Sequence, residues 1–267
     1  MTFRIGLPKR KADTQDDVVV GCADEQTVPR RSVAEVWFPA RRMHLAYYND
    51  RFDLKRGDIV YVDGKLKGYR GQVTEVNYNF KIRMSDYKRV TAVVDPTVRG
   101  QVFLTGTHYV AFDRAVLPID KVSRWFKAPN DENEEFVVGY DEVTFSLDDI
   151  SEMNVSSTVV SRGQSYYDSG KVRYLCVDGV KGYAIVSGSK PYEVEFEYKD
   201  GQIGKLTCSC FCSYNCKHEV AAMLELQTVL SQIKEHCADE YERTGYFAAI
   251  RGSLYDAVIR GEEIGIL

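Results

Sequence analysis

The chain has 267 residues, of which 44% are hydrophobic and 28% charged, the composition of an ordinary soluble globular protein with room for two modest domains. No run approaches the roughly 18 apolar residues of a membrane span, and the first residues lack the apolar stretch of a signal peptide, so we expect no membrane partner. The seven cysteines cluster instead of spreading as a disulfide framework would, which predicts a reducing, cytoplasmic compartment.

The formal net charge of −4 conceals two halves of opposite sign. Residues 28–128 hold 19 Lys and Arg against 10 Asp and Glu, whereas residues 129–267 hold 12 against 24. A change of sign on this scale predicts two domains with different partners, or two halves that attract each other.

Residues 1–27 read as a polar leader with one candidate strand at 18–20. From residue 33 onward the chain shows short segments that often alternate between polar and apolar residues and are rich in Val, Tyr and Phe, a pattern that predicts strands. These segments cover residues 34–38, 58–62, 72–76, 80–84, 89–94, 101–104 and 109–112. Short strands with frequent turn signals and no long helical period favour a small all-β barrel or sandwich over residues 28–128.

Residues 55–76 carry a distinctive turn pattern within this half. Gly57-Asp58 leads a strand, a turn rich in Gly and Lys follows, and Gly71-Gln72-Val73 opens the next strand. Tight turns at barrel corners need glycine, because they require a positive φ or leave no room for a side chain. The pattern resembles a KOW-type motif, which implies a small barrel of the kind found in RNA-associated and ribosome-associated proteins.

The same half interleaves basic residues with aromatic ones. Cations contact phosphates, and exposed aromatic faces stack on unpaired bases, so this half is a candidate nucleic-acid surface. Aromatic residues of ordinary strands beside a solvated basic face give the same pattern, and that interpretation stays open. The candidate nucleic-acid contacts are Arg41, Arg42, Lys65, Lys67, Arg70, Lys81, Arg83, Lys88 and Arg89.

A linker is predicted at residues 127–135, where a proline is followed by an acidic polar run with nothing to bury. We place the domain boundary here, so that the basic domain of residues 28–128 is followed by an acidic linker and hairpin at 129–155 and a second domain at 156–267. In the second domain, strands are expected at residues 159–160, 171–177, 182–187, 192–198 and 203–207. Asp178-Gly179 and Asp200-Gly201 are the hairpin turns between them.

Helices are expected at the end of the chain. Apolar residues recur there at steps of three and four, which marks one buried helix stripe; they are Val220, Met223, Leu226, Leu230, Ile233 and Cys237. A further helix is expected over residues 246–260, with Phe247, Ile250, Leu254 and Val258 on one side. The predicted fold class is therefore α+β: an N-terminal all-β barrel joined to a domain of hairpins and C-terminal helices.

Between the last predicted strand and the first predicted helix, residues 208–218 hold four cysteines and a histidine. Thiolate and imidazole are the ligands that Zn²⁺ prefers, and structural zinc sites take four of them in a tetrahedron. A Cys-x-Cys pair followed by Cys-x-His supplies three sulfurs and one nitrogen. The sequence therefore predicts a metal-stabilised binding module.

The order of segments 161–167, 170–172, 184–189 and 192–194, followed by Cys-x-Cys, Cys-x-His and a helix, resembles a SWIM-type zinc finger over residues 156–230. The resemblance implies zinc as the cofactor and roles in DNA binding or protein–protein contacts. The ligands it implies are Cys208, Cys210, Cys216 and His218.

An extra cysteine, Cys212, lies in the spacer at residues 211–215, which is at the short end of that family's pattern. A set with Cys212 in place of Cys208 is therefore chemically feasible. The gap of three residues between Cys212 and Cys216 leaves less room to wrap a tetrahedron, which favours the set with Cys208.

Three functions are compatible with these features, and none of them is an enzyme. No phosphate-binding glycine loop, catalytic triad signature or His-Glu-x-x-His is present, and no small-molecule substrate is evident. The favoured function is a zinc-dependent adaptor that contacts nucleic acid through the basic half. The alternatives are a protein–protein interaction module without nucleic-acid binding, and a thiol-redox or metal sensor.

Overall fold

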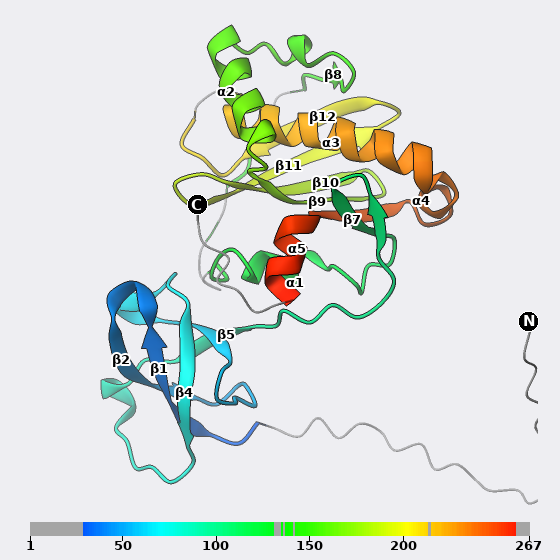
Figure 1. Cartoon of the computed structure of the whole chain (residues 1–267). Helices are drawn as coiled ribbons and strands as arrows, with labels where there is room; N and C mark the ends of the chain where they lie inside the picture. The colour runs from blue at the N-terminus through cyan, green and yellow to red at the C-terminus, as the bar shows by residue number, and fades with distance from the viewer. Residues whose placement is uncertain (1–28, 131–134, 136, 141, 213–214, 260–267) are drawn as a thin grey trace, which may run out of the picture.

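The computed structural model describes residues 29–130, 135, 137–140, 142–212 and 215–259. For residues 256–259 it describes the backbone alone. The described chain folds into two lobes, which we call the barrel lobe (residues 29–94) and the metal lobe (residues 95–259) (Figure 1). Each lobe contains one antiparallel sheet, of five and eight strands, and the longer helices lie in the metal lobe. The predicted α+β class is confirmed.

The barrel lobe is built from five short strands in the order β2-β1-β4-β3-β5. The two edge strands meet where Tyr48 bridges Arg89 and the Tyr48 N–H donates to the carbonyl of Lys88 at 2.9 Å, so the sheet curls into a small barrel. Inward side chains such as Val36, Phe38 and Val60 form a core of its own. The strands are β1 (Ser32–Phe38), β2 (Met43–Asn49), β3 (Ile59–Val62), β4 (Gly71–Asn77) and β5 (Val90–Val94).

The turn of the KOW-like segment joins β3 to β4 through a short 3₁₀ helix, η2 (Gly64–Leu66). A Cβ at Gly71 would lie 2.3 Å from Val36 and 2.8 Å from Phe38, so only glycine lets β4 approach β1 at this point. The strand expected at residues 80–84 is absent from the described structure, because these residues form a loop that ends in the 3₁₀ helix η3 (Met84–Asp86).

The sheet of the metal lobe runs in the order β6-β7-β13-β9-β10-β11-β12-β8. Its strands are β6 (Phe103–Thr105), β7 (His108–Ala111), β8 (Phe145–Ser146), β9 (Val172–Asp178), β10 (Lys181–Ser187), β11 (Pro191–Lys199), β12 (Gln202–Cys208) and β13 (Tyr246–Arg251). The sequence predicts that residues 28–128 form the N-terminal domain. Two strands from that range, β6 and β7, belong to the sheet of the metal lobe instead. β6 pairs with β7, and β7 pairs with β13, far along the chain, a long-range contact that no local pattern reveals.

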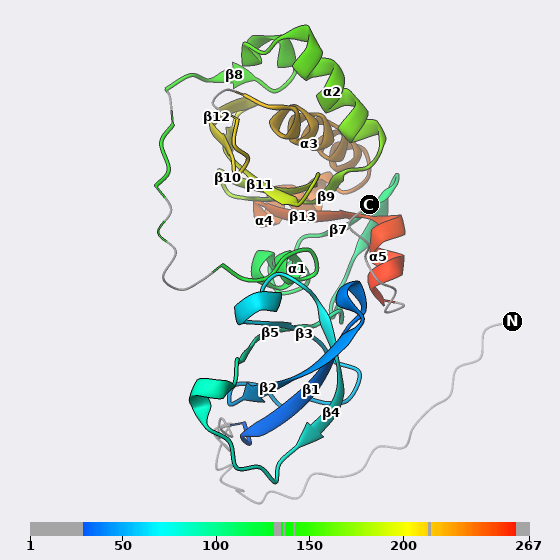
Figure 2. The same ribbon diagram turned by 90° about the vertical axis from the view of Figure 1, so that its left-hand side faces the viewer.

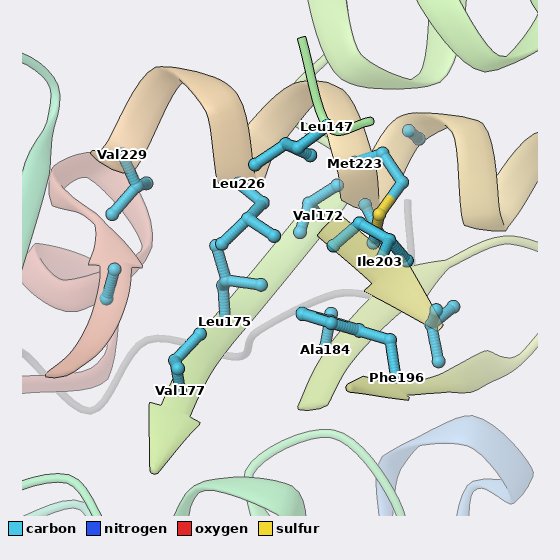
Figure 3. Close-up of a cluster of buried hydrophobic side chains, with 14 of the residues drawn as sticks. Leu147, Val172, Leu175, Val177, Ala184, Phe196, Ile203, Met223, Leu226 and Val229 are labelled. Carbon is cyan, nitrogen blue, oxygen red and sulfur yellow. The ribbon is translucent and has the colours of Figure 1, made fainter. Parts of the chain in front are cut away.

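Helices cover both faces of this sheet (Figure 2). The long helix α3 (Lys217–His236) crosses one face and packs against α2 (Ser157–Asp168), whereas α1 (Ile119–Arg124) covers the other. Figure 3 shows Met223 and Leu226 of α3 above Leu175 and Ala184 of the sheet. The remaining helices are α4 (Ala238–Thr244), α5 (Gly252–Ile259), η1 (Pro39–Arg41) and η4 (Ile150–Met153).

Two segments form a helix where a strand was predicted, or a strand where a helix was predicted. Residues 159–160, expected in a strand, lie in α2, whose N-cap Ser156 accepts a hydrogen bond from the Val159 N–H. Residues 246–251, expected in a helix, form β13. β13 is buried between β7 and β9, and the continuous apolar run of a central strand cannot be told from a buried helix by its period.

The lobes meet at α1. The Arg70 guanidinium of the barrel lobe donates to the carbonyl of Trp125, the residue that follows α1, at 3.4 Å. Within the metal lobe, the indole Nε1 of Trp125 donates to the carbonyl of Asp95 at 2.8 Å. Within the described residues, no helix has the length and apolar character needed to cross a membrane.

Candidate metal centre

Four predicted ligands converge where β12 ends and α3 begins. Cys208 is the last residue of β12, and Cys210 follows in the loop. Cys216 is the N-cap of α3, and His218 lies in the first turn of that helix. The structure therefore places both halves of the Cys-x-Cys and Cys-x-His pattern at one corner of the metal lobe.

The ligand atoms of Cys208, Cys210, Cys216 and His218 all lie within 4.8 Å of one another. The imidazole Nδ1 of His218 is 3.7 Å from the Cys208 sulfur and 3.6 Å from the Cys216 sulfur. Zinc–sulfur and zinc–nitrogen bonds of about 2.3 and 2.0 Å in a tetrahedron require S···N separations of about 3.5 Å. These two S···N separations and the chemistry of the four donor atoms fit a metal ion such as zinc.

Local hydrogen bonds hold the two halves of the site in place. The Glu219 carboxylate accepts from the Cys216 N–H at 2.6 Å, and the Cys216 side chain faces the Glu219 N–H, which together form a capping box at the start of α3. On the strand side, the Ser209 N–H donates to the Glu193 carbonyl, and the Ser209 hydroxyl accepts from the Glu193 N–H, both at 2.9 Å. The Asn215 amide, one residue before the N-cap of α3, donates to the Met153 carbonyl at 2.7 Å.

His218 is held between aromatic rings and is 4% exposed. The Tyr192 ring stacks on its imidazole at 4.2 Å between centroids, and the Tyr166 ring meets it edge-on at 5.4 Å. Burial, together with the neighbouring Lys217 ammonium, lowers the pKa of His218 to about 4. The imidazole is therefore neutral at physiological pH, the form that binds metals.

The opposite ring nitrogen, Nε2 of His218, is buried and has no hydrogen-bond partner among the described residues. This arrangement leaves Nδ1 as the nitrogen that faces the sulfurs. A metal-bound histidine usually donates its other ring N–H to an acceptor that orients the ring, whereas here the Tyr192 ring lies stacked on the imidazole.

Without metal the thiols of Cys210 and Cys216 retain their protons. Burial raises the pKa of Cys210 to about 12, and a hydrogen bond with Cys208 together with burial raises the pKa of Cys216. Because a metal binds the thiolate, an incoming ion displaces these protons.

The remaining cysteines lie apart from this cluster. Cys212, the alternative ligand, is exposed and is not a member of the group that the described residues form. Cys176 is buried in β9, where burial raises its thiol pKa to about 12, and Cys237 follows α3. Cys22 lies outside the described residues.

The predicted nucleic-acid residues lie on three loops of the barrel lobe. Arg41 and Arg42 are at the β1–β2 turn, and Lys65, Lys67 and Arg70 lie between β3 and β4. The remaining four, which lie between β4 and β5, are Lys81, Arg83, Lys88 and Arg89. The last two loops come together, because a Cβ at Gly64 would lie 2.9 Å from the Lys88 side chain.

At least four of these cations, Lys67 among them, interact with other residues of the protein. Arg41 donates to the Tyr69 hydroxyl at 2.6 Å and stacks over that ring, and Arg89 pairs with Asp50 at 2.7 Å. Arg70 is half-buried and faces Trp125 of the metal lobe. Arg70 therefore connects the lobes, whereas Lys65, Lys67, Lys81, Arg83 and Lys88 are exposed.

Sequence reasoning missed three residues that shape the metal site. Glu219 caps α3 and its pKa is raised to about 7 by burial; its place three residues after Cys216 is a capping signal that could have identified it. Tyr166 and Tyr192 come from α2 and β11, and no local pattern indicates that they meet His218.

Comparisons with known proteins returned no match to this chain, whether against protein-family models, curated proteins or solved structures. The assignment of this corner therefore rests on its own geometry: a zinc-finger-like cluster of three cysteines and one histidine that can hold a metal ion.

Proposed function

We propose that this chain is a non-catalytic, zinc-dependent binding protein whose barrel lobe contacts nucleic acid and whose metal lobe is held together by a structural zinc. We further propose that the metal corner is a SWIM-type zinc finger. The observation that carries the proposal is the Cys₃His cluster, whose donor atoms lie within 4.8 Å of one another.

The ligand count supports a structural role for the metal. A site with four protein ligands has no open position for a water or a substrate, unlike a catalytic zinc site with three. A ligand set that joins the end of β12 to the start of α3 instead ties two elements together. Structural zinc contributes on the order of 10 kcal/mol or more to the folding of such sites.

The charge of the barrel lobe supports nucleic acid as its partner. Residues 29–94 hold 14 Lys and Arg against 7 Asp and Glu. Exposed lysines at Lys65, Lys67 and Lys88 occupy loops that come together around Gly64. Cations on adjoining loops of a small barrel can neutralise successive phosphates of one strand.

The thiol-redox alternative has less support. Reactive thiols need a lowered pKa, because the thiolate is the nucleophile. The pKa of Cys210 and that of Cys216 are both raised in the metal-free site.

Binding of labelled single-stranded RNA and DNA, followed by fluorescence anisotropy, tests the nucleic-acid part. A binder that contacts six to ten phosphates loses about 10³–10⁵ in affinity between about 50 and 200 mM salt. The double variant Lys65→Ala, Lys88→Ala should reduce the magnitude of the salt slope by about 1.4, since each phosphate contact contributes about 0.7 on a single strand.

Lys199→Ala, at an exposed lysine at the end of β11 in the metal lobe, is the matched control and should leave the slope unchanged. Absence of binding to either nucleic acid at the lower salt concentration would contradict the proposal. It would leave the protein–protein module as the better account of the chain.

A further inference from the structure

A pair of aromatic rings lies on the outer face of the barrel lobe. Val36 and Phe38 of β1 point into the barrel core, so Trp37 between them points outward. Trp37 is half-buried and belongs to none of the apolar clusters that the described residues form. Its ring lies against the imidazole of His44, directly opposite on β2, at 4.6 Å between centroids. Trp37 therefore contributes to a surface and not to a core.

The row of outward side chains continues across the sheet. Gln72 of β4 lies opposite Trp37 in the strand register and is exposed, and the His44 side chain is 48% exposed. Residues directly opposite one another on paired strands share a face of the sheet. The row of His44, Trp37 and Gln72, which we call the ring platform, thus places two flat rings beside an amide that both donates and accepts hydrogen bonds.

Cations border the ring platform at the end where β1 turns into β2. Arg41 and Arg42 lie in that turn, and both are exposed. Arg41 donates to the Tyr69 hydroxyl at 2.6 Å, a bond that ties the turn to the loop that carries Lys65 and Lys67. This end of the barrel therefore attracts anions.

Carboxylates border the ring platform on the opposite side. Glu35 precedes Trp37 by two residues on the same face of β1, and its Oε1 lies 4.0 Å from His44 Nδ1. Glu75 of β4 lies opposite Glu35 in the register. Because both carboxylates repel phosphate, the backbone of an anionic ligand is directed to the side of Arg41 and Arg42.

These features specify the chemistry of the ligand. It needs a flat, uncharged face for the rings and a negatively charged backbone for the turn. A single-stranded nucleic acid has both, since its unpaired bases stack on aromatic side chains while cations contact its phosphates. The bases of a duplex are stacked on one another and leave no face free, so the platform selects single strands.

We propose that the ring platform binds single-stranded nucleic acid by stacking an unpaired base on the Trp37 ring. Arg41 and Arg42 hold the adjoining phosphates, and Gln72 hydrogen-bonds the edge of the base. The proposal rests on the nucleic-acid contact proposed above for the barrel lobe, and it adds the form of the nucleic acid and the side chains that select it.

Tryptophan emission of the full, zinc-loaded chain tests the proposal without any substitution. The chain has two tryptophans, and Trp125 is 0% exposed, so quenching by an added oligonucleotide reports on Trp37. Oligothymidylate and oligouridylate should quench the emission in proportion to the bound fraction, which the anisotropy of the labelled strand measures independently. A DNA duplex of equal length should bind more weakly and quench far less at the same bound fraction.

Variants locate the contact. Trp37→Leu keeps an apolar side chain but removes the ring, and should weaken binding of the single strand by about 5- to 150-fold, the loss expected for one stacked base. Trp37→Phe retains a ring and should recover most of the affinity. Tyr140→Leu removes a ring that is 57% exposed in the metal lobe and should leave the affinity unchanged. Circular dichroism melts show whether each variant keeps the wild-type fold.

Tryptophan emission that stays unchanged at full binding, or an affinity that Trp37→Leu does not reduce, overturns the ring platform and leaves the nucleic-acid contact of the barrel lobe standing. Equal affinity for duplex and single strand also overturns it, because stacking requires an unpaired base. Absence of binding to either nucleic acid at low salt rejects the platform together with the proposed function.

Discussion

Cys216 serves two purposes at once. Its sulfur faces the metal cluster at 3.6 Å from His218 Nδ1, and its side chain also caps the first turn of α3. Serine is among the preferred N-cap residues but is a poor zinc ligand. A Cys216→Ser substitution therefore separates the two roles, since it keeps the helix cap and removes the metal ligand.

We expect Cys216→Ser to reduce the zinc content of the purified protein from one ion per chain to nearly none, because three remaining ligands leave the structural tetrahedron incomplete. Elemental analysis after dialysis measures the content directly. Cys212→Ser is the matched control, since Cys212 is exposed and lies outside the cluster, and it should retain its zinc. Loss of zinc from both variants would assign the site to the alternative ligand set, which contains Cys212 as well as Cys216, and zinc retained by Cys216→Ser would contradict both sets.

The cluster of Cys208, Cys210, Cys216 and His218 that could hold a metal ion was predictable from the sequence, because Cys-x-Cys and Cys-x-His are local patterns and zinc chemistry restricts the donors. The residues that surround the cluster could not be predicted from the sequence. Tyr192 and Tyr166 meet His218 from elements remote in sequence, and the position of each ring depends on the packing of the whole lobe. The partners of Arg41, Arg70 and Arg89 are also remote in sequence, so they could not be predicted either.

At the scale of elements, the crossing of α2 and α3 depends on one glycine. Gly163 is buried, and a Cβ there would lie 2.4 Å from Val220 Cγ1 and 3.1 Å from the carbonyl oxygen of Lys217. Lys217 and Val220 flank the ligand His218, so the close approach of these helices also fixes the helical half of the metal site.

Gly163→Ala should destabilise the protein even though alanine favours a helix. Overpacking costs about 1–3 kcal/mol, and contacts of 2.4 and 3.1 Å with a β-branched side chain and a backbone oxygen place this site at the upper end of that range. The gain in helix propensity is about 1 kcal/mol, so we expect a net loss of about 2 kcal/mol. Urea denaturation measures the change. Ser161→Ala, at an exposed position of the same helix, should stay within about 0.5 kcal/mol of the wild type. Equal stability of the two variants would refute the steric account.

Sequence patterns identified elements best where one face is solvated. The stripe from Val220 to Ile233 predicted α3, and the hairpin signals Asp178-Gly179 and Asp200-Gly201 separate real strands. The pattern failed for β13, which is buried between two neighbours, so its residues carry no alternation. It failed for α2 because Ser156, its N-cap, was not recognised as a helix start.

On the scale of the whole molecule, the two lobes have separate cores. The barrel lobe buries Val36, Phe38 and Val73 in a cluster of its own, and the metal lobe divides its core between the two faces of its sheet. Contacts between the lobes include the polar bond from Arg70 to Trp125. Because the cores are separate, the metal lobe can lose its metal without loss of the barrel core.

Removal of zinc by a strong chelator should therefore unfold the region near residues 205–225 and leave the barrel lobe folded. The missing metal energy, on the order of 10 kcal/mol, exceeds what a polar corner of this size replaces. Circular dichroism melts with and without chelator should show the metal lobe shifting to lower temperature while the barrel transition stays in place. An unchanged melt after confirmed metal loss would show that zinc does not stabilise the fold.

The position of the cluster at the first turn of α3 has an electrostatic consequence. Three thiolates and one neutral imidazole around Zn²⁺ sum to a single negative charge. The aligned peptide dipoles of a long helix place a partial positive charge of about one half at its N-terminus, where anions are stabilised. The 20 residues of α3 thus favour the thiolate-bound, metal-loaded state of the corner over the neutral thiols that remain when the metal leaves.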